Sequence, residues 1–72
     1  MKCTVKLIWD DEARVWYTDS NDLPVFLNDG SYDDLIERVR VAAPEVLEES
    51  SGYIGPIDLI FESVRVEKAQ VS

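Results

Sequence analysis

The 72-residue sequence contains no histidine and a single cysteine, Cys3. One cysteine cannot close a disulfide within the chain, and without histidine a zinc-type Cys/His cluster is excluded. The commonest general base is missing too, and with it the Ser–His and Cys–His nucleophile arrangements. The three glycines match no phosphate-cradling pattern, so no cofactor is expected. These absences predict a binding protein and not an enzyme.

Basic residues are also scarce, because seven Lys and Arg stand against fifteen Asp and Glu, which gives a net charge of −8. Affinity for nucleic acid rests on neutralising phosphates with basic side chains, so direct binding to nucleic acid or to an anionic membrane is not expected. A basic protein partner fits the charge better. The alternative is that the acidity only keeps a small domain soluble.

No long apolar run is present, so neither a signal peptide nor a membrane span is predicted, and a cytoplasmic location is expected. The length allows one domain, residues 1–72. A domain this small buries only ~60% of the surface that its unfolded chain exposes. Association with a second copy, most simply as a homodimer, is therefore expected to add buried apolar area.

Three short strands are expected before the middle of the chain. Residues 3–9 alternate apolar and polar side chains, which is typical of a strand with one buried face. Residues 14–20 are rich in strand-forming side chains and predict a hairpin partner across the turn at 10–13. A third strand is expected at 23–27, with Pro24 at its beginning or on an edge.

A long helix is predicted next. Ser31 is placed to cap it, and the apolar residues between Leu35 and Leu47 recur at helical spacing. Pro44 interrupts the pattern, so the helix either continues with a kink to about Glu49 or restarts at Pro44. Because the apolar stripe keeps its phase across Pro44, continuation is favoured.

A last strand is expected from Ile57 to about Lys68, with an apolar phase switch that indicates either a β-bulge or two covered faces. The predicted fold is α+β, in the order β-β-β-α-β, with a mostly antiparallel sheet and the helix packed on one face. The other face is left bare, and its apolar side chains predict an interface for a second copy or a partner. The candidate interface residues are Ile8, Trp16, Phe26, Ile60, Val64 and Val66.

Three features of the sequence could carry chemistry or bind a ligand. Cys3 lies on the predicted inner face and is expected to be a small buried hydrophobe. The acidic turn at 10–12 lacks the spaced ligands and glycine of a calcium loop, so no metal is expected there. Trp9, Trp16 and Tyr17 could form a stacking platform for single-stranded nucleic acid, but their neighbours are acidic, which favours packing in a core or a protein interface.

The chain resembles a small prokaryotic family known only as a domain of unknown function, which is similar to the N-terminal domain of HicB-type antitoxins. The resemblance covers residues 3–50. The motifs that carry it are Val5-x-Leu7-x-Trp9-Asp10-x-Glu12-Ala13-x-Val15-Trp16, Ser20-x-Asp22-Leu23-Pro24, Ser31-x-x-x-Leu35-Ile36-x-Arg38 and Pro44-Glu45-x-Leu47-Glu48. Val25 departs from the pattern, because the family usually has glycine after Asp22-Leu23-Pro24.

The resemblance implies a domain that packs against a small basic RNA-cleaving toxin of the HicA type and covers its active site. HicB antitoxins usually carry a C-terminal DNA-binding motif, and residues 63–72 are expected to form strand and tail instead. Two other hypotheses remain open. One is an orphan homo-oligomeric domain with a structural or small-ligand role, and the other is an enzyme that uses converging carboxylates.

Overall fold

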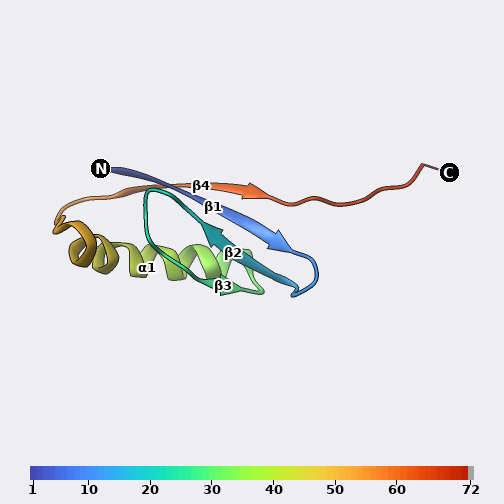
Figure 1. The fold of residues 1–72 in the computed structure, drawn as a ribbon, viewed down its shortest axis with the longest axis horizontal. Helices are drawn as coiled ribbons and strands as arrows, with labels where there is room; N and C mark the ends of the chain where they lie inside the picture. The colour runs from blue at the N-terminus through green and yellow to red at the C-terminus, as the bar shows by residue number, and fades with distance from the viewer. Residues whose placement is uncertain (72) are drawn as a thin grey trace.

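The computed structural model describes residues 1–71, which form a four-stranded sheet and one helix (Figure 1). The predicted α+β class, the order β-β-β-α-β and the helix on one face are confirmed, and the sheet is mixed, because β4 pairs parallel to β1. The elements in chain order are β1 (Lys2–Asp10), β2 (Val15–Asp19), β3 (Asn28–Asp29), α1 (Tyr32–Ser51) and β4 (Asp58–Val64).

The first strand lies inside the sheet, whose strand order is β3-β2-β1-β4. The β1–β2 and β2–β3 pairings are antiparallel, whereas β4 returns after the helix and runs parallel to β1. A parallel neighbour requires a long crossover, and α1 supplies it. The parallel pairing extends from Lys2 opposite Asp58 to Ile8 opposite Val64, which leaves the far side of β4 as a free edge.

The turn between β1 and β2 sets the register of the hairpin. One carboxylate oxygen of Asp10 accepts from the backbone N–H groups of Glu12 and Ala13, at 3.1 and 3.2 Å. The N–H of Arg14 donates to the Asp10 carbonyl at 2.8 Å, and Arg14 adopts a φ of 59°. This four-residue turn places Trp9 opposite Trp16, so both indoles lie on the same face of the sheet.

The core lies between that inner face and α1. From β1 it takes the odd-numbered residues, which confirms the alternation seen in the sequence. The helix contributes its buried stripe at three- and four-residue spacing. The buried apolar residues are Cys3, Val5, Leu7, Trp16, Leu23, Val25, Leu35, Val39, Ala43 and Leu47.

The prediction of a strand at 23–27 is wrong, since the third strand is only Asn28–Asp29. Pro24 has no N–H for a ladder, and the N–H of Val25 donates to the Leu23 carbonyl at 2.7 Å in a tight turn around Pro24. The buried hydroxyl of Thr18 holds this segment. It donates to the Val25 carbonyl at 2.8 Å and accepts from the N–H of Leu27 at 3.0 Å.

The helix begins after Ser31, whose hydroxyl accepts from the N–H of Asp34 at 3.3 Å, as the capping prediction expects. It passes through Pro44 without restarting and ends at Ser51, two residues beyond the predicted end. Gly52 closes it in the left-handed conformation with φ 73°, and its N–H donates to the Glu48 carbonyl at 2.9 Å.

The last strand is shorter than the predicted 57–68, because β4 ends at Val64. Its register with β1 is unbroken, so the phase switch reflects apolar residues on both faces and no bulge. Leu59 and Phe61 pack against the core, whereas Ile60 and Val64 point the other way. Residues 65–71 continue as an extended tail that leaves the body of the domain (Figure 1).

Candidate interaction surface

The face of the sheet opposite α1 carries an apolar strip. Tyr17 lies opposite Ile8 across the β1–β2 pairing, and Ile8 lies opposite Val64 across the β1–β4 pairing. With Ile60 these residues form what we call the outer face. Ile60 is 43% exposed, Val64 40% and Tyr17 39%, and no element of the described chain covers them.

A charged row, formed by Asp19, Lys6 and Glu62, crosses the outer face between this apolar strip and Ile60. Lys6 is the register partner of Asp19 on one side and of Glu62 on the other. Together with Asp22 these residues line a polar hollow of about 220 Å³. Its three carboxylates and one ammonium leave the hollow negatively charged, which suits an inserted arginine or lysine side chain.

The predicted interface residues do not all lie on the outer face. Ile8, Ile60 and Val64 do, but the placement of Trp16 there is wrong. Trp16 is buried on the inner face, with its ring centroid 4.9 Å from that of Tyr32 and 5.4 Å from that of Trp9. The turn at 11–14 pairs Trp9 with Trp16, so the even-numbered residues of β2 share the inner face with the odd-numbered residues of β1.

The remaining two predicted residues are exposed but lie off the sheet. Phe26 is 85% exposed in the irregular segment before β3, and Val66 is 79% exposed in the tail after β4. Tyr17, which was not among the predicted residues, takes the place on the outer face that Trp16 was expected to fill. Its exposed ring follows from the same hairpin register.

At the Asp22-Leu23-Pro24 turn, side chains form hydrogen bonds to the backbone of β1 in place of a neighbouring strand. Beyond Asp19 the second strand stops pairing with β1, and Thr4 is left without a backbone partner there. The carboxylate of Asp22 accepts from the Thr4 N–H at 3.0 Å, and the Ser20 hydroxyl donates to the Thr4 carbonyl at 2.7 Å. Leu23 is fully buried beneath them, so the three-residue motif has a structural role.

Val25 fits this turn in place of the glycine expected there. Its side chain is buried in the core, and its φ is not positive. A β-branched residue is therefore unstrained at this position.

A family model described as a domain of unknown function, DUF1902, matches residues 2–71. The chain belongs to the DUF1902 family. It is also similar in structure to hypothetical protein TTHA1013 from the extremely thermophilic bacterium Thermus thermophilus, with a TM-score of 0.81 and 30% sequence identity. The match covers 96% of this chain and 100% of that one. A search of curated proteins found no match.

At the end of β4 this DUF1902 domain has a cluster of aromatic rings and arginines. The guanidinium of Arg65 lies 4.5 Å from the ring centroid of Trp9 and 5.9 Å from that of Trp16, and Arg14 approaches Trp9 to 5.5 Å. Such cation–π contacts are worth about 0.5–1 kcal/mol each at exposed sites. They hold the Arg65 side chain against the two indoles at the start of the tail.

Sequence reasoning did not find a shallow apolar groove beside α1. It has a volume of about 390 Å³ and is formed mainly by Leu27, Val41 and Ala42. Val41 is 62% exposed and lies off the buried stripe of the helix. An apolar residue outside the stripe is the feature of the sequence that could have indicated this groove. The rim carries Glu37, Arg38 and Glu45.

Nothing in residues 1–71 gathers three Cys, Asp or Glu side chains in a way that could hold a metal ion. Cys3 is buried in the core. Within the same residues, no helix has the length and apolar character needed to cross a bilayer.

Proposed function

We propose that this DUF1902 domain is a non-catalytic protein-binding domain whose outer face receives a basic protein. The observation that carries the proposal is the juxtaposition of the apolar strip formed by Ile8, Tyr17 and Val64 with the negatively charged hollow beside it. Protein interfaces commonly combine an apolar centre with a polar rim. A partner that presents an apolar patch next to arginine or lysine complements both parts.

The negative net charge of the whole domain supports a positively charged partner. At a net charge of −8 its field attracts basic proteins and raises their rate of encounter, an effect that salt screens. Binding is therefore expected to weaken with rising ionic strength through slower association.

The more specific proposal is a HicB-like antitoxin that covers a basic HicA-type RNA-cleaving toxin. It rests on the resemblance of residues 3–50 to the N-terminal domain of HicB-type antitoxins. The β-β-β-α-β fold is compatible with that role. The proposal requires that residues 1–71 of the domain contact the toxin and that they make no contact with DNA.

The test uses the product of a small basic gene adjacent to the one encoding this chain. The full chain is expected to co-purify with that product and to suppress its ribonuclease activity. In Tyr17→Lys the strip is interrupted, and the affinity is expected to fall about tenfold or more, equivalent to about 1.4 kcal/mol. Val41→Lys is the matched control, because it makes the same charge change at an exposed residue on α1 and should leave affinity within about twofold.

Two results would contradict the proposal. If no adjacent basic gene exists and no basic protein is captured, the antitoxin role fails. If Val41→Lys weakens the complex as much as Tyr17→Lys does, the binding surface is not the outer face.

The competing candidate is an orphan homo-oligomer with a structural or small-ligand role, which the free edge of β4 favours. Light scattering separates the two. A tight oligomer whose mass stays the same when the toxin is added, so that no toxin is bound, supports the homo-oligomer.

A further inference from the structure

We infer that two copies of this chain pair antiparallel through the free edge of β4 and the tail at 65–71, joining their sheets into one. The occupant of this edge is a second copy of the chain. The inference stands apart from the proposed function, which uses the outer face.

The free edge is long and continuous with an extended segment that its own domain does not cover. The strand order leaves β4 paired on one side only. Beyond it, Val66 and Val71 are 79% and 97% exposed, and the tail runs clear of the sheet and helix (Figure 1). A long unpaired edge of this kind is a template for another strand.

The hydrogen-bonding groups of this edge come from odd-numbered residues. The N–H of Asp58 donates to the Met1 carbonyl at 2.8 Å, so the N–H and C=O groups of even-numbered residues in β4 point to β1. Those of odd-numbered residues, from Leu59 through Ser63, point away from β1. If the tail keeps this alternation, Arg65 and Glu67 continue the same free row.

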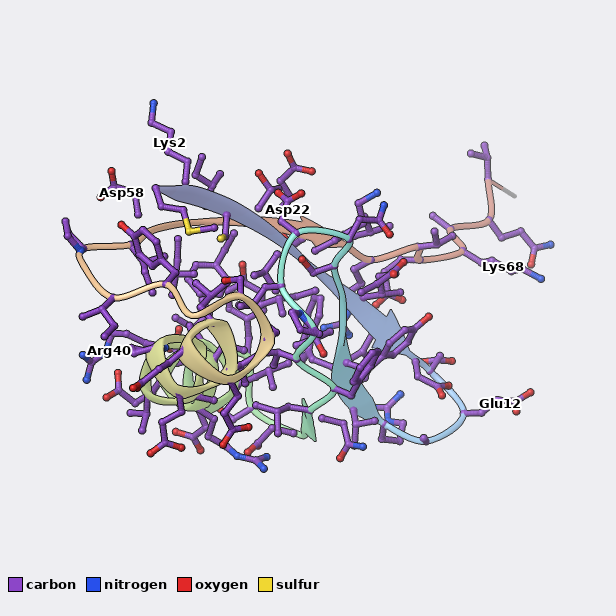
Figure 2. All side chains as sticks on the ribbon, turned by 60° about the vertical axis from the view of Figure 1, so that its left-hand side comes forward. Lys2, Glu12, Asp22, Arg40, Asp58 and Lys68 are labelled. Carbon is purple, nitrogen blue, oxygen red and sulfur yellow. The ribbon has the colours of Figure 1, made fainter. Side chains whose placement is uncertain are left out.

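Charge selects this edge for self-association. Two copies repel each other through a net charge of −8 each. Residues 58–71 carry three acidic and two basic side chains, so they account for only −1 of that total. Figure 2 places Lys68 on the tail, away from Arg40 on the helix. A second copy therefore meets the least repulsion along β4 and the tail.

The sequence of the tail favours one register. Two antiparallel copies are related by a two-fold axis perpendicular to the sheet, so odd-numbered residues face odd-numbered residues. Centring the pairing on Val66 places Arg65 opposite the partner's Glu67, twice by symmetry. Centring it on Arg65 would place two guanidinium groups directly opposite each other, which is destabilising.

In the favoured register Val66 faces the partner's Val66 as a non-hydrogen-bonded pair. The Cα atoms of such a pair are about 4.5 Å apart. Phe61 lies opposite the partner's Val71 on the inner side. The two outer faces lie on the same side of the joined sheet, so the dimer presents the proposed binding surface twice.

The first test is sedimentation equilibrium with two charge reversals. The wild-type chain is expected to dimerise below about 0.5 mM. Arg65→Glu and Glu67→Arg are each expected to weaken self-association about tenfold, because each places like charges opposite one another. An equimolar mixture of the two is expected to recover the dimer, since every crossing pair is again of opposite sign.

The mixture separates this interface from a structural effect within one chain. Arg65 also contacts Glu67 in its own chain, with Nε 2.5 Å from Oε1, and mixing does not restore that internal pair. Circular dichroism checks that each variant is folded. A wild-type chain that stays monomeric at about 0.5 mM overturns the inference, as does a mixture no better associated than its components.

A second measurement is disulfide cross-linking of the chain with one cysteine added. Val66→Cys is expected to form a disulfide-linked dimer rapidly under mild oxidation, because the two thiols face each other across the axis. The control is Ile54→Cys, which is 82% exposed but lies in the connector before β4. Equal cross-linking of the two variants overturns the register. Loss of toxin binding in Tyr17→Lys, without loss of the dimer, would leave this inference intact.

Discussion

Replacing Thr18 by valine tests how the irregular segment before β3 is held on the sheet. Valine has nearly the same shape as threonine, so the core at this 7% exposed position stays filled. What is lost is the hydroxyl that donates to the Val25 carbonyl and accepts from the Leu27 N–H. Both backbone groups then lose their side-chain partner.

The expected cost follows from those two bonds. Each is worth about 1 kcal/mol, and a buried polar group left without a partner costs about 1–3 kcal/mol. We therefore expect Thr18→Val to lower the free energy of unfolding by about 2–4 kcal/mol. A domain of this length has about 4–11 kcal/mol in total, so the variant should be only marginally stable.

Urea denaturation followed by tryptophan fluorescence provides the assay, since Trp16 lies on the same strand. Thr18→Ser keeps the hydroxyl and should lose only about 1 kcal/mol for the missing methyl group. Thr4→Val is the second control, because the Thr4 hydroxyl makes no hydrogen bond among the described residues. If Thr18→Val is no less stable than Thr4→Val, the hydroxyl does not hold the segment and the reasoning is refuted.

Three further predictions concern the helix. Pro44→Ala restores a donor to the Arg40 carbonyl and should raise the free energy of unfolding by about 1–3 kcal/mol in the same urea assay. Gly52→Ala should lower it by about 1 kcal/mol through backbone strain at φ 73°, whereas Gly30→Ala, which has no positive φ, should change it by less than about 0.5 kcal/mol. The hydrogen bond from Arg40 lowers the pKa of Glu37 below its ordinary 4.5. The charged form is favoured in the folded state, so this stabilisation is present at neutral pH and lost as the pH falls through the lowered pKa. In an NMR titration Arg40→Gln should raise the pKa of Glu37, and an unchanged midpoint would contradict the assignment.

Strong periodicity made two elements predictable. Cys3, Val5 and Leu7 entered the core and Trp9 packs against it, because one face of this strand is covered by a helix and the other is not. Helical spacing and the cap at Ser31 placed α1, and the unbroken stripe foretold that the helix would pass Pro44. In both cases a local pattern and the tertiary fold agree.

The errors arose where the decisive contact is distant in sequence. Residues 15–18 carry side chains suited to either face, so only the turn conformation at Arg14 decides that Trp16 is buried and Tyr17 exposed. The segment at 23–27 reads as a strand by composition. The segment is irregular instead, because the Thr18 hydroxyl binds the Val25 carbonyl and the Leu27 N–H. No local pattern in the sequence reveals these two hydrogen bonds. The outer face was foreseen as bare, but Trp16 lies on the inner face, Phe26 and Val66 lie off the sheet, and Tyr17 was missed.

The position of β1 between β2 and β4 has a consequence for folding during synthesis. Lys2 pairs with Asp58, so the second neighbour of the first strand is synthesised only after the helix. Contacts so distant in sequence close large loops and slow folding. Until then one edge of β1 is unpaired and Val5 and Leu7 lack the cover of β4. Variants that delay the arrival of β4 should therefore aggregate during expression, even when their purified native state is as stable as that of the wild-type chain.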